Sequence, residues 1–216
     1  MRYLRTPDVY RPQSDTALLM RAMAADGVPR GGAALDVCTG TGAVALDALA
    51  RGAEHVTAVD VSRSALLSAW LNSRLRGARI ELLHGEFSRV LRRRRFDTVL
   101  ANPPYVPGPE PALDRRRGRA WNAGSAGRSV LDPLCRMLPD LLNPHGTALI
   151  VHSTLSGPDD TLARLRADGL KAAIVARETI GFGPVLHRRA AWLESTGSIA
   201  PGQREEELVV IRADRI

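Results

Sequence analysis

Mostly apolar segments alternate with helical segments along nearly the whole chain, and this alternation leaves few folds open. Residues 33–37 form one such segment, and residues 43–51 then have a helical pattern that stops at Gly52. The next apolar run, 55–59, is followed by a helix that begins at Ser62. Strands that are apolar on both faces and separated by helices are typical of a parallel sheet covered on both sides. We therefore predict a doubly wound α/β fold.

The same pattern continues to the end of the sequence and predicts one Rossmann-like domain over residues 1–216. A chain of 216 residues is long enough to bury one α/β core and too short for two. We expect a seven-stranded sheet whose last strand is antiparallel. The expected strands are 33–37, 55–59, 80–83, 96–101, 147–152, 170–176 and 207–211.

Helix boundaries are indicated by capping residues. Ser14 or Asp15 is expected to cap the first helix, which should end at Gly27. Asp132 and Pro133 suit the N-cap and first-turn positions of a later helix.

Two segments do not fit the alternation. Residues 102–130 are rich in Pro, Gly and Arg, which predicts a long loop, and we expect its part 106–130 to face the substrate. Residues 178–203 give no clear pattern, so we predict an irregular insertion there, in the form of a hairpin or a lid. Both segments are expected to frame the acceptor.

The composition excludes several classes of protein. No apolar run approaches the ~18 residues that a membrane helix needs. The two cysteines, Cys38 and Cys135, provide neither a disulfide framework nor metal-ligand spacing, and we expect reduced thiols in a cytoplasmic protein. No metal site is predicted, because the five histidines are scattered at His55, His84, His145, His152 and His187.

The net charge of +7 is of the kind associated with a nucleic-acid partner. All but one of the 30 basic residues are arginine, however, and this skew resembles a codon bias, which weakens the inference. Arginine runs at 92–95 and 115–119 are interpreted as solvated surface, with contact to phosphates as the alternative.

A glycine loop follows the first predicted strand and is flanked by two acidic residues. Gly40 and Gly42 allow a tight turn and a close approach of a ligand to the backbone. Asp60 ends the second strand, where a carboxylate in nucleotide-binding α/β folds meets a ribose diol. The loop also fits a dinucleotide fingerprint. Asp36 argues against NAD, because a carboxylate before the turn attracts a cationic amino group and repels a pyrophosphate.

A second motif, Asn102-Pro103-Pro104-Tyr105, directly follows the predicted strand 96–101. Carboxyl ends of parallel strands share one crevice, so this motif and the glycine loop should face the same site. The Asn102 side-chain oxygen and the Pro103 carbonyl can each accept one N–H of a planar NH₂ group, and Tyr105 can pack against that group. Together the two motifs predict a nitrogen methyltransferase that uses S-adenosylmethionine.

These motifs resemble those of the HemK-like glutamine methyltransferases, which modify translation release factors. The resemblance runs from about Tyr10 to Ala176 and is greatest to their short eukaryotic and archaeal branch. Besides the motifs above, it includes the opening segment 10–16, Gly85-Glu86-Phe87, and the segment 120–128, which resembles the family's glycine-rich loop. The resemblance implies the class I methyltransferase fold.

Site residues follow from the motifs and the resemblance together. Catalysis is assigned to Asn102, Pro103 and Tyr105. The cofactor site is expected to comprise Thr16, Asp36, Cys38, Gly40, Gly42, Asp60, Glu86, Phe87 and Asn102. Two of these depart from the family pattern. Cys38 replaces a common glycine, so we expect a negative φ there, and Glu86 replaces an aspartate.

The resemblance implies that the acceptor is a glutamine side chain in a protein, such as the Gly-Gly-Gln loop of a release factor. It also raises a small zinc-binding activator as a partner, because members of the short branch work with one. The alternatives are an adenine amino group in RNA or DNA, a natural product, a non-catalytic cofactor-binding subunit and, last, a NAD oxidoreductase.

Overall fold

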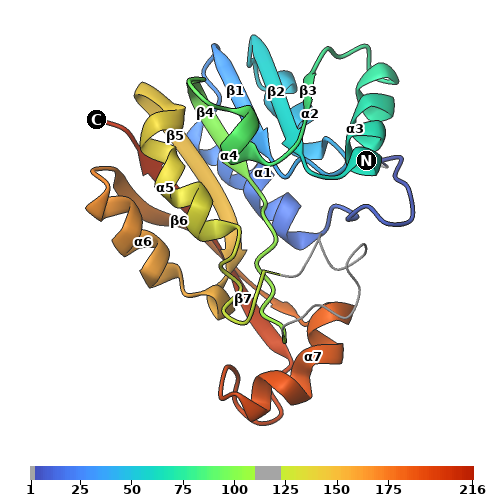
Figure 1. The fold of residues 1–216 in the computed structure, drawn as a ribbon, viewed down its shortest axis with the longest axis vertical. Coiled ribbons are helices and arrows are strands. Elements are labelled where there is room, and N and C mark those ends of the chain that lie inside the picture. The colour runs from blue at the N-terminus through green and yellow to red at the C-terminus, as the bar shows by residue number, and fades with distance from the viewer. Residues whose placement is uncertain (1–2, 110–122) are drawn as a thin grey trace.

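A computed structural model describes residues 3–109 and 123–216 of the chain. Its centre is a seven-stranded sheet in the order β3-β2-β1-β4-β5-β7-β6 (Figure 1). The strands are β1 (Ala33–Val37), β2 (His55–Asp60), β3 (Glu81–His84), β4 (Phe96–Ala101), β5 (Leu142–Ser153), β6 (Lys171–Gly181) and β7 (Glu205–Asp214). The first five strands pair in parallel, whereas β7 runs antiparallel to both β5 and β6. The predicted fold class and the antiparallel last strand are confirmed.

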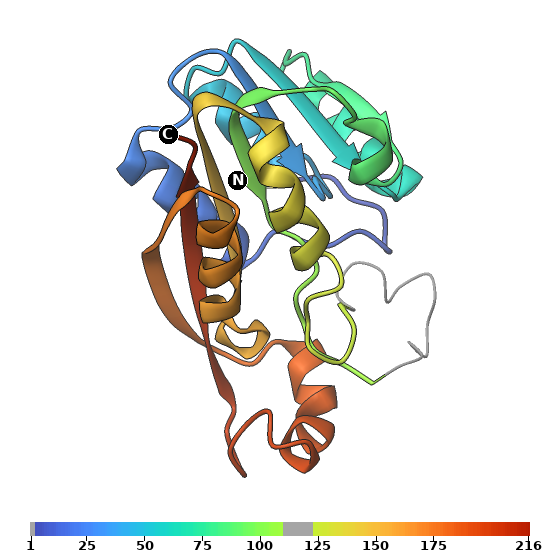
Figure 2. The same ribbon diagram turned by 60° about the vertical axis from the view of Figure 1, so that its left-hand side comes forward.

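Helices cover both faces of this sheet (Figures 1 and 2). The helices are α1 (Ser14–Asp26), α2 (Ala43–Ala50), α3 (Arg63–Arg74), α4 (Phe87–Val90), α5 (Leu131–Leu141), α6 (Pro158–Ala167) and α7 (Pro184–Ser195), with a short 3₁₀ turn, η2 (Thr154–Ser156). Contacts join α1, α2 and α3 to one face and α5 and α6 to the other, where α4 packs beside α5, while α7 lies beyond the end of the sheet. No helix in the described part of the chain has both the length and the apolar character needed to cross a membrane.

The core lies between the central strands and these helices. Leu35, Leu100 and Leu149, on β1, β4 and β5, are completely buried. The buried residues of α5 recur at helical spacing, at Leu131, Leu134, Cys135, Leu138 and Leu141. Burial raises the pKa of the Cys135 thiol to about 11, so this cysteine is protonated and packs as an apolar side chain.

Two of the predicted helix starts are wrong. Gln13 is the N-cap of α1, so Ser14 and Asp15 both lie in its first turn. Val130 is the N-cap of α5, which places Asp132 inside the helix, where it pairs with Arg128. Asp15 accepts from the Thr16 N–H of the same turn and from the Tyr10 hydroxyl, whereas Asp132 pairs with Arg128. The predicted cap at Ser62 is confirmed, because its hydroxyl accepts from the Ala65 N–H.

Segment 178–203 is not irregular, which corrects the prediction. Strand β6 continues to Gly181, and α7 follows from Pro184 to Ser195. Leu186, Ala190 and Leu193 form the buried face of α7 at helical spacing. The glycines on either side of α7 obscure this short stripe in the sequence. In the long loop, residues 106–109 and 123–130 carry no helix and no strand, as predicted, and 110–122 lie outside the described residues.

One buried amide joins the N-terminal segment to the glycine loop. Asn72 on α3 is fully buried. Its Oδ1 accepts from the Leu4 N–H at 2.8 Å, and its Nδ2 donates to the carbonyls of Leu4 at 2.8 Å and Thr41 at 3.0 Å. A single side chain therefore satisfies three backbone groups from two separate segments.

We predict that Asn72→Ala lowers the free energy of unfolding by about 2–4 kcal/mol, because it removes three hydrogen bonds to the backbone, of which the one to the Thr41 carbonyl is buried. Urea unfolding followed by circular dichroism measures this. Asn143→Ala is the matched control, since Asn143 makes one exposed bond to Asp97, and it should cost less than about 1 kcal/mol. Equal stability of the wild type and Asn72→Ala would contradict the assigned role.

Candidate active site

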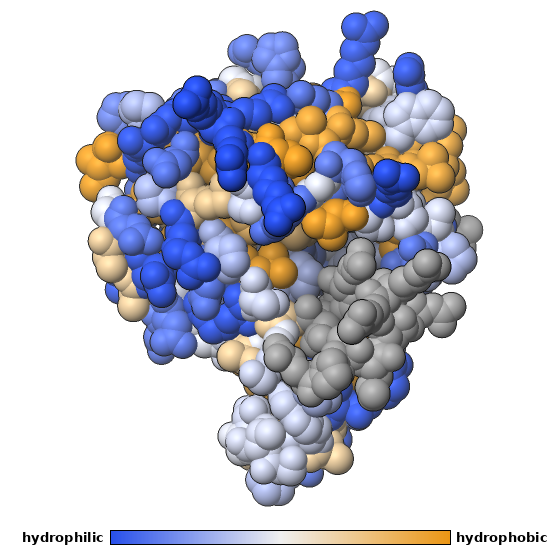
Figure 3. Space-filling view, in the orientation of Figure 1, coloured by the Kyte–Doolittle hydropathy of each residue, from blue (hydrophilic) through white to orange (hydrophobic). Residues whose placement is uncertain are grey.

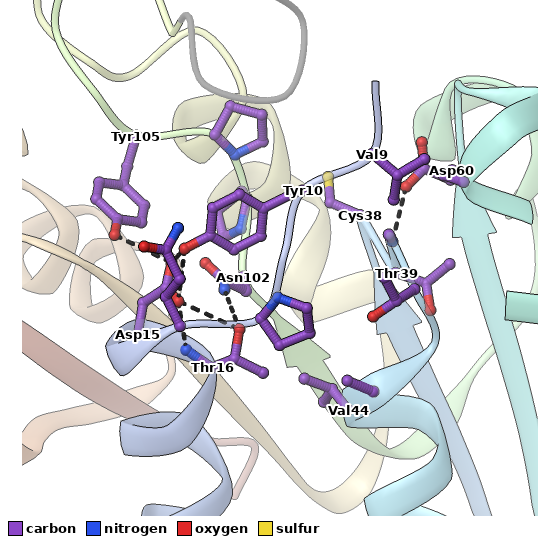
Figure 4. Close-up of a pocket in the computed structure, with 18 of the residues that line it drawn as sticks. Val9, Tyr10, Asp15, Thr16, Cys38, Thr39, Val44, Asp60, Asn102 and Tyr105 are labelled. Carbon is purple, nitrogen blue, oxygen red and sulfur yellow. Dashed lines mark hydrogen bonds between the residues drawn. The ribbon is translucent and has the colours of Figure 1, made fainter. Parts of the chain in front are cut away.

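A cavity of about 910 Å³ opens at the carboxyl ends of β1, β2 and β4 (Figure 4). It is lined by the start of α1, the glycine loop, the tetrapeptide after β4, and the segment that joins β6 to α7. A volume near the upper end of the ~300–1,000 Å³ typical of ligand sites leaves room for a nucleoside-sized cofactor and part of an acceptor. A second hollow, of about 260 Å³, shares Cys38, Asp60 and Pro104 with it.

The glycine loop has three residues in the left-handed region. They are Cys38 (φ 61°), Gly40 (φ 53°) and Gly42 (φ 78°). The negative φ expected for Cys38 is therefore wrong, and the left-handed backbone of this residue costs roughly 1–2 kcal/mol. Nothing lies within 4 Å of the place where a Cβ would stand on Gly40, whereas a Cβ on Gly42 would lie 3.0 Å from the Ala69 Cβ. Gly42 thus allows close packing on α3, and Gly40 borders open space.

Asp60 is held at the end of β2 by backbone donors. Its Oδ2 accepts from the Gly40 N–H at 3.0 Å, and its Oδ1 accepts from the Ser62 N–H at 2.9 Å. Burial raises the pKa of this carboxyl, and the backbone donors oppose that rise. Because each oxygen keeps a further lone pair, the two together suit a pair of vicinal hydroxyls.

Asp36, at the end of β1, is only 1% exposed and lines the same cavity. The Thr39 hydroxyl at 2.6 Å and the Ala45 N–H at 3.1 Å both donate to its Oδ2. Burial raises the pKa of Asp36 to about 7. A cation in the cavity would favour the ionised carboxylate, whereas a pyrophosphate would disfavour it. The donors and acceptors of this end of the cavity therefore fit an adenosine that carries a cationic amino-acid tail.

Glu86 and Phe87 border the smaller hollow beside Asp60. Phe87 is buried and offers an apolar wall. Glu86 is exposed, and its carboxylate accepts from the Ser88 hydroxyl at 2.7 Å and pairs with Arg89 at 3.4 Å. The structure thus places both predicted residues near Asp60, with the Glu86 side chain held by local partners.

Asn102 leaves β4 at the middle of the cavity (Figure 4). Its Nδ2 donates to Thr16 Oγ1 at 3.2 Å, and the Thr16 hydroxyl donates to Asp15 Oδ1 at 3.2 Å. A hydroxyl has one hydrogen, so Thr16 can only accept from Asn102. This arrangement fixes the amide, and its Oδ1 has no hydrogen-bond partner among the described residues.

Tyr105 and its neighbours are fixed from several sides. The Ser156 hydroxyl donates to the Tyr105 carbonyl, and a Cβ on Gly127 would lie 2.3 Å from that carbonyl oxygen. On α7, Arg189 donates to the carbonyls of Val106 at 3.1 Å and Pro107 at 2.8 Å. The glycine-rich segment and α7 therefore both support the backbone that follows the tetrapeptide.

Sequence reasoning missed the acidic side of the site. Asp15 is buried, and both of its oxygens accept from the Tyr10 hydroxyl, at 2.9 and 2.8 Å. The Tyr105 hydroxyl also donates to Asp15, at 3.2 Å. Glu206, on β7, lines the cavity as well. In the sequence Asp15 resembles a helix cap and Glu206 belongs to an acidic run, so neither carried a signal of its own.

Within residues 3–109 and 123–216, no group of three or more His, Cys, Asp or Glu side chains is placed to hold a metal ion.

The chain is similar in sequence to known methyltransferases. The family described as methyltransferase small domain matches residues 10–115. A putative protein N5-glutamine methyltransferase of Methanocaldococcus jannaschii is 30% identical over 82% of this chain and 88% of its own length. The release factor glutamine methyltransferase of Geobacter sulfurreducens is 29% identical over 87% of this chain and 68% of its own length.

Among solved structures, a chain of the E. cuniculi Mtq2–Trm112 complex superposes with a TM-score of 0.66 at 24% identity, over 97% of this chain and 99% of that one. At that identity the likeness shows the fold alone. The sequence relationships go further than the fold. The chain belongs to the family of HemK-like glutamine methyltransferases, class I enzymes that take the methyl group from S-adenosylmethionine.

Proposed function

We propose that this protein methylates the side-chain nitrogen of a glutamine in a translation release factor. The observation that carries the proposal is the fixed amide of Asn102, whose Oδ1 has no partner among the described residues while Thr16 holds its Nδ2. Two further facts support it. The relatives in M. jannaschii and G. sulfurreducens are named as glutamine methyltransferases, and the second is named for release factors.

The acceptor amide is bound by the tetrapeptide. One N–H of the glutamine NH₂ donates to Asn102 Oδ1 and the other to the Pro103 carbonyl. These bonds orient the nitrogen and increase its electron density, which matters because an amide lone pair is delocalised and weakly nucleophilic. The proline rings hold both acceptors in place before the substrate arrives. No strong base is required, because the N–H proton becomes acidic once the nitrogen carries the methyl group.

The opposite end of the cavity holds the cofactor. S-adenosylmethionine, when bound, supplies an electrophilic methyl group on a sulfonium. Asp60 accepts hydrogen bonds from the ribose hydroxyls, and Asp36 attracts the amino group. Gly40 lets the backbone approach the cofactor, Gly42 lets the loop pack closely on α3, and Cys38 and Thr16 also line the cavity. Phe87 and Glu86 would border the adenine. Asn102 would lie between cofactor and acceptor, so the positioning of these two reactants contributes most of the rate enhancement.

Two partners follow from this proposal. The acceptor is a protein in the cytoplasm, where release factors act. A small activator subunit is a second partner, because the similar E. cuniculi protein is described in a complex with Trm112 that methylates eRF1.

The nucleic-acid alternative finds less support in the described residues. Run 92–95 precedes β4, at the end of the sheet opposite to Asn102. Arg94 pairs with Glu81, and Arg95 donates to the Leu142 carbonyl at 2.9 Å. On the face shown in Figure 3, hydrophilic side chains over α4 and α5 are interrupted by hydrophobic ones. Run 115–119 lies outside the described residues.

Affinity for S-adenosylhomocysteine, the demethylated product, should depend on the protonation of Asp36. With a pKa of about 7 in the free protein, this carboxyl is ionised above pH 7 and attracts the amino group, and it loses that charge as the pH falls below 7. We expect binding to weaken by up to about tenfold per pH unit below 7. Calorimetry between pH 6 and pH 8 measures this. Asp36→Asn should bind weakly at every pH, and a wild type with constant affinity would contradict the role.

Removal of the acceptor contact should separate chemistry from cofactor binding. We predict that Asn102→Ala lowers single-turnover methylation by at least about a hundredfold, because the lost bond acts on the reacting nitrogen. Cofactor affinity should stay within about tenfold. Asn143→Ala, far from the cavity, should react at the wild-type rate. A near wild-type rate for Asn102→Ala would remove the motif from the mechanism.

Neutralising the second arginine run tests the choice of substrate. Replacing Arg115, Arg116, Arg117 and Arg119 by alanine should lower methylation of a release factor by less than about tenfold, because a peptide acceptor makes no phosphate contacts. Binding of RNA and DNA at two salt concentrations is measured in parallel. If the change abolishes nucleic-acid binding, and the wild type never methylates release factor, the adenine alternative replaces this proposal.

A further inference from the structure

Glu206 is a buried carboxylate that the mechanism above does not use. It is the second residue of β7 and pairs with Ile180 of β6. Only 6% of it is exposed, although its neighbour Glu205 lies on the surface. Glu206 lines the 910 Å³ cavity. A carboxylate is therefore buried in the protein wall of the active site.

One oxygen of this carboxylate has no partner. Glu206 Oε2 makes no hydrogen bond with any described residue, although Ser153 lies within hydrogen-bond reach of the side chain. Asp15 nearby is different, because it accepts from Tyr10, Tyr105 and Thr16. An unpaired buried acceptor destabilises a protein, so its presence in a cavity wall points to a ligand that pairs with it.

The position of Glu206 identifies which ligand this is. Besides burial, the charge of Glu206 raises the pKa of Tyr10 and of Tyr105, and the charge of Asp15 raises the pKa of Glu206, so Glu206 lies near these three residues. In Figure 4, Asp15 and Tyr105 lie on one side of Asn102 and Asp60 lies on the other. Of the cofactor residues assigned above, Cys38 lies with Asp60, whereas Thr16 adjoins Asp15 and holds the Asn102 amide (Figure 4). The partner of Glu206 therefore belongs to the acceptor.

The surroundings favour a neutral donor over a cation. Ile180 pairs with Glu206 across β6 and β7, and Val185 and Leu186 line the same cavity. An ammonium group has three N–H donors, and those not bound to Glu206 would face these apolar side chains. A peptide N–H has a single hydrogen, which one carboxylate oxygen satisfies.

We propose that Glu206 is a specificity-determining residue that accepts a hydrogen bond from a backbone N–H of the acceptor segment beside the methylated glutamine. This inference rests on the proposed function. Glu206 binds the main chain of the substrate, whereas Asn102 and Pro103 bind the side-chain amide. The two contacts together would place the glutamine in register with the methyl donor.

The test compares Glu206→Met and Glu206→Gln with Glu205→Gln, a matched control on the same strand. Methylation of purified release factor gives kcat and KM, calorimetry gives cofactor affinity, and thermal unfolding gives Tm. We expect Glu206→Met to raise KM by at least about tenfold, with kcat and cofactor affinity within about threefold of wild type. Glu206→Gln keeps an oxygen acceptor and should stay within about threefold of wild type in kcat/KM. Glu205→Gln should change nothing.

Stability separates recognition from a structural role. Loss of an unpaired buried carboxylate should leave Tm unchanged or raise it. A lower Tm together with lower activity would overturn the proposal in favour of a structural role, and an unchanged KM in Glu206→Met would overturn it directly. Equal losses in Glu206→Gln and Glu206→Met would show that the partner is a cation. If the wild type itself methylates no release factor, the proposed function fails first and the assignment of Glu206 fails with it.

Discussion

The pairing of β1 with β4 is the constraint on which the site depends. In this parallel pair Val37 lies opposite Ala101, so Cys38 and Asn102 leave the sheet side by side. The glycine loop and the tetrapeptide are 64 residues apart in the sequence when counted from Cys38 to Asn102, and this register brings them together. The proposed sites for the methyl donor and for the acceptor then share one cavity, and no extra segment is needed to bring them together. The same pairing buries Leu35 and Leu100, so the core fixes the geometry of the site.

A second constraint acts from the first turn of α1. Asp15 accepts a hydrogen bond from the Thr16 hydroxyl, and the Thr16 oxygen accepts one from Asn102 Nδ2. This short chain of hydrogen bonds determines which end of the Asn102 amide faces the acceptor. Tyr10 and Tyr105 donate to the same carboxylate and limit its rotation. Asp15 therefore orients the amide proposed to bind the acceptor without having to touch the acceptor itself.

The layout of the fold could be predicted because continuous apolar runs between helices permit little else than a doubly wound sheet. The positions of Gly40, Gly42, Asp60 and Asn102 after strand ends followed from the same pattern. Gly40, Asp60 and Asn102 line the cavity, whereas Gly42 packs on α3. The conformation of Cys38 could not be predicted, because a residue with a Cβ normally has a negative φ. The loop requires a left-handed residue there, between the Val37 strand end and the Thr39 N–H bond to Val59.

Other features depend on contacts that no local pattern records. Glu206 stands in a run of three glutamates, and only the pairing of β7 with β6 determines which of them turns inward. Helix α7 has a buried stripe of three residues, which the surrounding glycines outweigh in the sequence. Asp15 has the sequence context of a cap, and its role appears only when Tyr10 and Tyr105 fold over it.

Identification of the methylated atom tests the central claim most directly. Wild-type protein is incubated with labelled S-adenosylmethionine and one substrate at a time. The substrates are release factor, a release factor whose Gly-Gly-Gln glutamine is changed to alanine, RNA and DNA. We predict that one methyl group appears on the glutamine side chain of the first substrate, as located by peptide mass spectrometry, and that the alanine variant stays unlabelled. Label on RNA or DNA with none on release factor would contradict the account.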